Sequence, residues 1–127
     1  MKKLSVVIPA YNEEKRITAT LQSVDGYLEK QPYDYEIIVI DNNSKDRTSE
    51  VVRNLEATTV QKSKVVLVKT PGKGAAVKAG LLESATGDIV MFMDADNATP
   101  ISEIEKFLPY FDQGYDVVIG SRYTEPD

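Results

Sequence analysis

The sequence predicts an α/β fold: a doubly wound, mainly parallel sheet sandwiched by helices. Short apolar runs rich in β-branched residues alternate along the chain with amphipathic segments of helical spacing. The apolar runs are nearly continuous, which is typical of strands buried on both faces. Because the chain has 127 residues and shows no internal repeat, low-complexity tract or linker, we expect one domain over residues 1–127.

Five apolar runs are expected to form the strands. They are Leu4–Ile8, Tyr35–Ile40, Lys64–Val68, Ile89–Met93 and Asp116–Gly120. Pro9 is expected to end the first of them. The chain stops soon after the fifth run without a closing helix, so we expect a domain that is cut partway through.

The first helix is expected to begin near Asn12, a good N-cap, with Glu13 and Glu14 in a first turn that suits the helix dipole. Its apolar residues recur on one face: Ile17, Leu21, Val24 and Leu28. A second helix is expected from about Thr48, with Val51, Val52 and Leu55 facing inward.

Two further helices are expected around the fourth strand. The third helix has Val77, Leu81 and Ala85 as its spine and runs to Gly87, a good residue to follow a helix end. The fourth begins at Thr99-Pro100. Its apolar positions are Ile101, Ile104, Leu108 and Phe111.

Composition excludes several classes of site. The chain has no cysteine and no histidine, which leaves out disulfides, thiolate nucleophiles, His-based triads and His-ligated zinc. The net charge is −5 and no basic cluster resembles a nucleic-acid footprint, so we expect no nucleic-acid partner. No apolar run is long enough to span a membrane or to serve as a signal peptide, so a cytoplasmic location is expected.

The fourth apolar run ends in two aspartates one residue apart, Asp94 and Asp96. Mg²⁺ and Mn²⁺ prefer carboxylate oxygens and often share substrate phosphates as ligands. Taken alone, however, an Asp-x-Asp is more often a polar strand-to-helix turn. The rest of the chain has to decide between these two interpretations.

Polar residues follow most of the other expected strands as well. They are Tyr11, Asn12 and Glu13 after the first, Asp41 after the second, and Ser121 and Arg122 after the fifth. In a parallel sheet these residues emerge at one edge, where ligands bind. Because several carboxylates in one place repel each other unless a cation or hydrogen-bond donors are present, the convergence favours a metal-dependent site.

Other phosphate-binding patterns fit poorly. Gly72-Lys73-Gly74 is not a Walker A loop, and no Gly-x-Gly-x-x-Gly follows the first strand. The stretch Asp94–Thr99 is only weakly similar to the Asp-x-Asp-x-Thr of haloacid-dehalogenase-type phosphatases. Thr99 stands one residue too late, and that motif normally follows the first strand.

Four segments together resemble the motifs of the family-2 glycosyltransferases. They are Val6–Glu14, Ile38–Thr48, Gly72–Ala76 and Asp94–Asp96, in matching order and spacing. Val118–Arg122 is similar to a further block of the polyprenyl-phosphate sugar synthases. The resemblance is greatest to the dolichyl-phosphate glucose or mannose synthase type, and it covers essentially the whole chain.

The resemblance implies the GT-A fold of nucleotide-diphospho-sugar transferases and a role for each matching residue. The nucleotide would be held by Pro9, Tyr11, Glu13, Asp41, Lys73 and Asp94. The metal, Mg²⁺ or Mn²⁺, would be held by Asp96 and Asp94, with Asp96 the direct ligand and Asp94 also able to contact ribose. Arg122 would pair with the diphosphate, so that Asp94, Asp96 and Arg122 form the catalytic set.

Four of these residues have a structural alternative. Glu13 could compensate the helix dipole, Asp41 could cap the following helix, Lys73 could be a solvated loop residue, and Arg122 could form a surface salt bridge. The chain also departs from the family's second motif, usually written V-V-D-D-G-S-x-D-x-T and normally having Asp-Gly or Asp-Asn after the first Asp, because Asn42 and Asn43 follow Asp41. Asn tolerates left-handed backbone geometry, so the turn can survive, but one carboxylate is lost.

The implied activity is transfer of a hexose, with inversion, from a UDP- or GDP-sugar to a polyprenyl (dolichyl) phosphate at the cytoplasmic face of a membrane. Two alternatives stay open. The chain could be a truncated, non-catalytic module that binds nucleotide sugars, or a metal-dependent phosphatase or nucleotidyltransferase. A homodimer through an exposed sheet edge is a further expectation.

Overall fold

In the computed structural model, five parallel strands form one sheet in the order β3-β2-β1-β4-β5. The structure describes residues 3–69, 73–78, 84–87, 89–93 and 117–119. The strands are β1 (Leu4–Ala10), β2 (Tyr35–Asp41), β3 (Ser63–Leu67), β4 (Ile89–Phe92) and β5 (Val117–Ile119). β1 is central, so its residues pair with β2 on one side and with β4 on the other.

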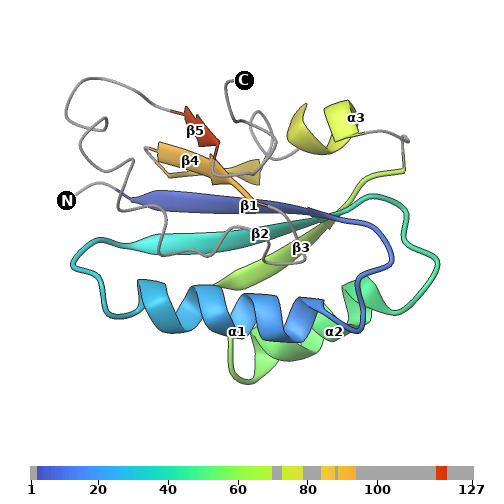
Figure 1. The fold of residues 1–127 in the computed structure, drawn as a ribbon, viewed down its shortest axis with the longest axis horizontal. Coiled ribbons are helices and arrows are strands. Elements are labelled where there is room, and N and C mark those ends of the chain that lie inside the picture. The colour runs from blue at the N-terminus through green and yellow to red at the C-terminus, as the bar shows by residue number, and fades with distance from the viewer. Residues whose placement is uncertain (1–2, 70–72, 79–83, 88, 94–116, 120–127) are drawn as a thin grey trace, which may run out of the picture.

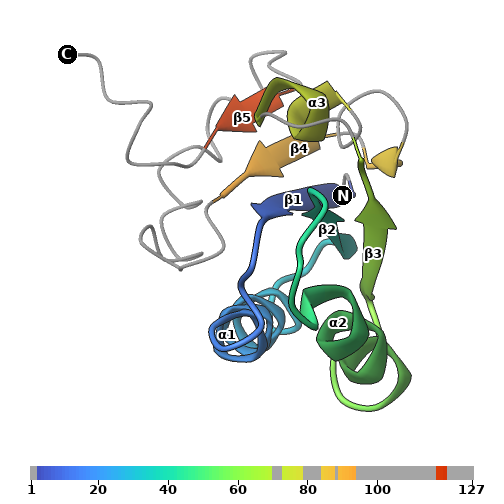
Figure 2. The ribbon, with the colours of Figure 1, turned by 90° about the vertical axis from the view of Figure 1, so that its right-hand side faces the viewer.

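Three helices accompany the sheet within the described ranges: α1 (Ile17–Leu28), α2 (Thr48–Ala57) and α3 (Lys73–Lys78). α1 and α2 lie together on one side of the sheet, and α3 lies on the other side (Figures 1 and 2). The predicted α/β sandwich is therefore confirmed. No helix in these ranges combines the length and the apolar character needed to cross a membrane.

Alternation along the strands divides the core into two clusters. On the side of α1 and α2, residues Leu4, Val6, Ile8 and Ala10 of β1 pack with Ile17, Leu21, Val24 and Leu28 of α1, all buried. On the other side the buried residues are Val7, Ile38, Ile40, Val90 and Phe92. Both faces of β1 and β2 are apolar, which is why these strands read as nearly continuous apolar runs in the sequence.

The predicted strands agree with the observed ones to within two residues at each end, but Pro9 does not end β1. The strand continues to Ala10, with Pro9 opposite Ile40 of β2. Met93 N donates to Val7 O, while Asn42 N donates to Ala10 O from the β2 side. The backbone nitrogen of Pro9 therefore points to the β4 side, because residues two apart in a strand direct their backbone groups to the same side. Its missing N–H falls beyond the last described β1–β4 pair, Val7 with Phe92, and interrupts no described ladder hydrogen bond.

Two helix boundaries differ from the predicted ones. α1 begins at Ile17, so Asn12 is not its N-cap, and its first turn contains no acidic residue. The third helix does not run to Gly87, because Ala85 and Thr86 are not helical. Ala85 still packs against the second core cluster, whereas Leu81 and the predicted helix after Thr99 lie outside the described residues.

Candidate functional site

The strand order changes direction between β1 and β4. From β1 the chain proceeds outward through β2 to β3, and it then returns past α3 to place β4 on the other side of β1. In open α/β sheets, ligands bind outside the carboxyl ends of the strands at such a switch point. The carboxyl ends of β1 and β2 lie on the right of Figure 1 and face the viewer in Figure 2.

The loops that follow β1 and β2 at this edge are joined by hydrogen bonds in both directions. The Asn12 amide donates to Ser44 Oγ over 2.8 Å, and the Lys45 amide donates to Asn12 Oδ1 over 2.8 Å. The Glu13 amide donates to Thr48 Oγ1 over 2.9 Å. Glu14 is joined to its neighbours by longer bonds, from its amide to Asp46 Oδ2 (3.2 Å) and from the Arg47 amide to its Oε1 (3.3 Å). We call these two joined segments, residues 12–14 and 44–48, the loop bridge.

Two asparagines give these loops their shape. Asn12 has φ 53° and Asn43 has φ 61°, and each stands two residues after the end of its strand. This left-handed conformation is costly for most residues with a β-carbon, and Asn adopts it more readily than most. Asn43 therefore gives the turn after β2 a left-handed residue at the position where the family motif usually has Gly.

Asp41 ends β2 and is buried. Its Oδ1 accepts from the Ser44 amide over 2.9 Å, and its Oδ2 accepts from the hydroxyl of Ser49 in α2. The structural alternative, in which Asp41 caps the first amides of α2, is not observed, because neither of these two bonds comes from a backbone amide of α2. The carboxylate instead holds the turn closed at the base of the loop bridge.

Asp46 takes the capping role next to α2. Its Oδ1 accepts from the Thr48 amide (3.0 Å) and from the Thr48 hydroxyl (2.5 Å). Desolvation acts to raise the pKa of Asp46, but these bonds and the bond from the Glu14 amide outweigh it and lower the pKa below 3.8. Reasoning from the residues did not assign this role. The turn- and cap-forming residue types signal a turn, but they do not identify the partner loop.

Three of the predicted nucleotide-binding residues lie on or beside β1 and its loop. Pro9 is partly buried in β1, and Tyr11 is 53% exposed at the carboxyl edge. The Glu13 carboxylate forms an ion pair with Arg16 (Oε1 to Nη2, 2.6 Å) and its side chain is 15% exposed. The structural alternative for Glu13, dipole compensation in the first turn of α1, does not apply, because Glu13 precedes the first residue of α1 by four residues.

The remaining predicted site residues are only partly covered by the structure. Lys73 is the first residue of α3. Asp94, Asp96 and Arg122 lie outside the described residues. The chain reaches Asp94 from Met93, which is buried and whose amide is bonded to Val7 O over 3.0 Å. Within the described ranges, no group of three or more acidic residues could hold a metal ion.

Comparison with known proteins adds to this geometry. The sequence model of the family described as "Glycosyl transferase family 2" matches residues 5–127. The chain belongs to glycosyl transferase family 2. Its parallel sheet, with helices on both sides, is accordingly the GT-A fold that the sequence analysis expects.

Two relatives of this chain carry names that concern polyprenyl phosphates. The undecaprenyl-phosphate 4-deoxy-4-formamido-L-arabinose transferase of Aeromonas hydrophila is 40% identical over 130 residues, which cover 100% of this chain and 39% of the relative. The human dolichyl-phosphate beta-glucosyltransferase is 41% identical over 112 residues, which cover 83% of this chain and 34% of the relative. The chain thus spans between a third and two fifths of the length of these relatives.

A solved structure shares the fold. The mannosyltransferase PcManGT from Pyrobaculum calidifontis, in complex with GDP-Man and Mn²⁺, superposes with a TM-score of 0.63 at 31% sequence identity. The match covers 75% of this chain and 28% of PcManGT. Similarity at this level shows that the two chains share a fold over the matched part.

Proposed function

We propose that this chain is the donor-binding part of an inverting glycosyltransferase that takes a hexose from a UDP- or GDP-sugar. The observation that carries the proposal is the loop bridge at the carboxyl edge of the sheet, beside the switch point between β1 and β4. It holds the loops after β1 and β2 together at the edge where Asp94-x-Asp96 follows β4 in the sequence. Sugar transfer itself is proposed for the whole protein, because the chain spans only part of its relatives.

Tyr11, Asp41 and Glu13 are the proposed contacts of the nucleoside. The exposed ring of Tyr11 is available to stack on a planar base. Pro9, two residues earlier, restricts the backbone φ angle just before this loop. Asp41 would accept an N–H of the base. Its two oxygens already accept from Ser44 and Ser49, but a carboxylate has about four acceptor positions, so capacity is left. Glu13 would accept from a ribose hydroxyl.

Asp94 and Asp96 are the proposed metal ligands, and Lys73 and Arg122 are the proposed partners of the phosphates. The donor chemistry fits Mg²⁺ or Mn²⁺, because the chain offers carboxylate oxygens and has no histidine or cysteine to favour a softer ion. When bound, such an ion neutralises charge on the departing diphosphate. Arg122 would offer a planar fork of N–H donors to the same oxygens, and Lys73 would offer a single positive charge.

A polyprenyl phosphate is the proposed acceptor. The names of both relatives concern such lipid phosphates, and a phosphate oxygen is already anionic near neutral pH, so no general base is needed to activate it. A lipid acceptor would bring the enzyme to the cytoplasmic face of a membrane. We also keep the proposal of a homodimer, for which the edge strand β5 offers an unpaired side within the described sheet.

Calorimetry with UDP and GDP, each with Mn²⁺, with Mg²⁺ and with EDTA, tests the donor site. We expect one nucleotide to bind more tightly with metal, and Asp94→Asn to reduce that gain by about tenfold or more. Asp34→Asn is the matched control. It removes the same charge from the opposite edge of the sheet, where Asp34 pairs with Lys62.

Absence of metal-dependent nucleotide binding by the folded chain would refute the proposal. Assays with the full-length protein then separate the alternatives. Transfer to a polyprenyl phosphate identifies the glycosyltransferase, binding without transfer identifies a non-catalytic module, and phosphate release from a generic phosphomonoester identifies a phosphatase.

A further inference from the structure

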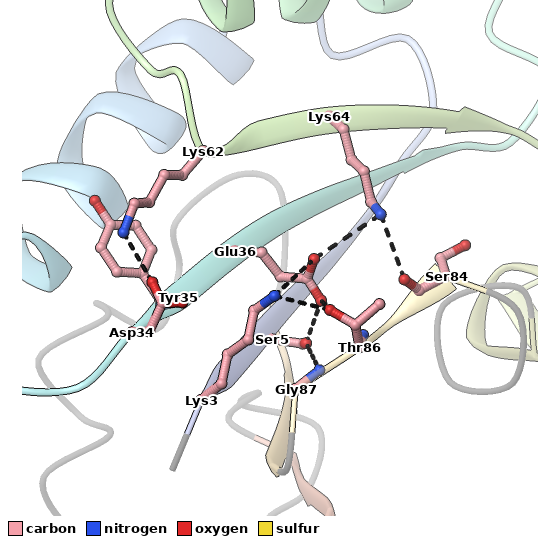
Figure 3. Close-up of polar contacts among 10 residues, drawn as sticks. All are labelled: Lys3, Ser5, Asp34, Tyr35, Glu36, Lys62, Lys64, Ser84, Thr86 and Gly87. Carbon is pink, nitrogen blue, oxygen red and sulfur yellow. Dashed lines mark hydrogen bonds and ion pairs between the residues drawn. The ribbon is translucent and has the colours of Figure 1, made fainter. Parts of the chain in front are cut away.

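A second polar cluster lies at the opposite, amino-terminal edge of the sheet and is centred on Glu36 of β2 (Figure 3). Three donors meet at its Oε2: the Ser5 hydroxyl at 2.5 Å, the Thr86 amide at 2.7 Å and the Thr86 hydroxyl at 3.0 Å. Ser5 and Glu36 are direct partners in the β1–β2 register, and the Glu36 side chain is only 13% exposed. A mostly buried carboxylate thus joins β1 and β2 to the segment just before β4.

The surroundings of Glu36 require its negative charge. Its Oε1 lies 3.8 Å from Lys3 Nζ and 3.9 Å from Lys64 Nζ. Desolvation acts to raise the pKa of Glu36, but the hydrogen bonds from Ser5 and Thr86 and the charge of Lys3 outweigh it and lower the pKa. A neutral glutamine would have to turn its amide N–H₂ either toward the three donors or toward the two ammonium groups.

The same cluster holds residues 84–87 at further points. The Gly87 amide donates to Ser5 Oγ (2.8 Å), and Lys3 Nζ donates to Thr86 Oγ1 (2.8 Å). Lys64 Nζ donates to Ser84 O at 3.4 Å. A β-carbon added at Gly87 would lie 2.6 Å from Ser5 Oγ and 2.8 Å from Lys3 O, so this segment is pressed directly against β1.

The contact matters because β4 is short. It has four residues, and its pairing with β1 begins at Leu4 opposite Ile89, two residues after Gly87. At its other end the chain passes from Met93 to Asp94. A shift of one residue along β1 would exchange the faces to which all the following side chains point.

We propose that Glu36 is a positioning residue that fixes β4 lengthwise on β1 and thereby sets the register in which the chain leaves β4 at Met93, directly before Asp94 and Asp96 in the sequence. The inference rests on the proposed function for the role of those two aspartates. Glu36 would act without touching the nucleotide, since it lies at the amino end of β2 and Asp41, a proposed nucleotide contact, lies at the carboxyl end.

The test compares Glu36→Gln with wild type and with Asp34→Asn. Asp34 lies at the same edge, and its carboxylate accepts from Lys62 Nζ (2.9 Å) and the Tyr35 amide (2.8 Å); among the described residues it forms no hydrogen bond or ion pair with β4. At a temperature where all three proteins are folded, Glu36→Gln should reduce the gain in nucleotide affinity from Mn²⁺ by about tenfold. Affinity in EDTA should stay unchanged, and Asp34→Asn should match wild type in both measurements.

Hydrogen exchange provides a measurement that needs no nucleotide. The Met93 amide, bonded to Val7 O, should exchange faster in Glu36→Gln, while the β1–β2 ladder keeps its protection. If Glu36→Gln does not fold, Thr86→Val removes one donor from an exposed residue and should produce a smaller change of the same kind.

A lower melting temperature with unchanged metal dependence and unchanged β4 exchange would overturn the inference, because a purely structural role predicts that result. If wild type shows no metal-dependent nucleotide binding, the proposed function fails. The exchange of β4 then decides the anchoring role of Glu36: faster exchange supports it, and wild-type exchange refutes it.

Discussion

At the scale of single residues, the two left-handed asparagines carry much of the loop geometry. Asn12 and Asn43 occupy equivalent places two residues after β1 and β2, at φ 53° and 61°. Asn12 also accepts from the Lys45 amide, so its identity is set by its side chain as well as by its backbone. Asn43 is exposed, which makes it the better position for testing the backbone alone.

Replacing Asn43 with Ala and with Gly should therefore have different effects on stability. Asn43→Ala should lower the free energy of unfolding by about 1 kcal/mol, because an ordinary β-carbon is strained in the left-handed region. Asn43→Gly should change the free energy of unfolding by only about a few tenths of a kcal/mol, because Gly relieves the strain in the folded state but adds conformational freedom to the unfolded chain. Urea denaturation measures both. Equal losses would show that the turn does not depend on φ at this position.

The role of Asn43 could be predicted from the sequence, and that of Asn12 could not. Asn43 follows the second strand in a motif where a left-handed residue is expected. Asn12 precedes a helical pattern, so it was predicted to be an N-cap, and this was wrong. Its partners, Ser44 and Lys45, belong to another loop. A preference for local capping cannot reveal a hydrogen bond between segments so distant in the sequence.

At the scale of elements, β4 is a short strand, and the segment just before it makes contacts of its own with β1 and β2. It is shorter than β1 and β2, and the segment before it is fitted closely under Lys3 and Ser5. Gly87 was predicted to follow a helix end. In the structure it matters because it has no β-carbon, and atoms of Ser5 and Lys3 lie close to where a β-carbon would be.

Gly87→Ala should destabilise the protein by about 1–3 kcal/mol, because backbone atoms of Lys3 and Ser5 would have to move. Gly26→Ala is the matched control. Gly26 lies inside α1 with nothing within 4 Å of an added β-carbon, so the same substitution should stabilise the protein by roughly 0.5–1 kcal/mol. Thermal and urea denaturation give both values. A Gly87→Ala protein as stable as wild type would contradict the close fit.

The strands themselves were largely predictable from the sequence. The apolar runs located all five, because burial on both faces leaves a nearly continuous apolar stretch. The course of β1 through Pro9 could not be predicted in the same way. Whether a strand can continue through a proline depends on which neighbouring strand the missing N–H faces, and this is known only once the sheet is assembled.

At the scale of the whole molecule, acidic side chains make stability depend on pH. The pKa values of Asp34, Glu36 and Asp46 are all lowered from ordinary values of 3.8, 4.5 and 3.8. For Asp34 the main cause is the hydrogen bond from Lys62. A lowered folded-state pKa contributes stability above the unfolded pKa, and that contribution is lost as the pH falls through the folded value.

The melting temperature should therefore stay nearly constant from neutral pH to about 5 and fall progressively below about 4.5. Glu36→Gln should be less stable than wild type at neutral pH, and the difference should shrink as acid protonates Glu36 in the wild-type protein. Calorimetric scans across this range test both statements. A difference that stays constant down to acid pH would show that the charge of Glu36 does not stabilise the fold.

The central position of β1 also has a consequence for synthesis of the chain. Residues up to Leu67 can form β1, β2 and β3 with α1 and α2, through pairings between successive strands. The side of β1 that pairs with β4 stays unpaired until Ile89 has been synthesised, because Leu4 pairs with Ile89. Such distant pairings form slowly, and an unpaired apolar strand is a site of aggregation until it is covered. The strand at the centre of the finished sheet is, during translation, the exposed edge of a half-built one.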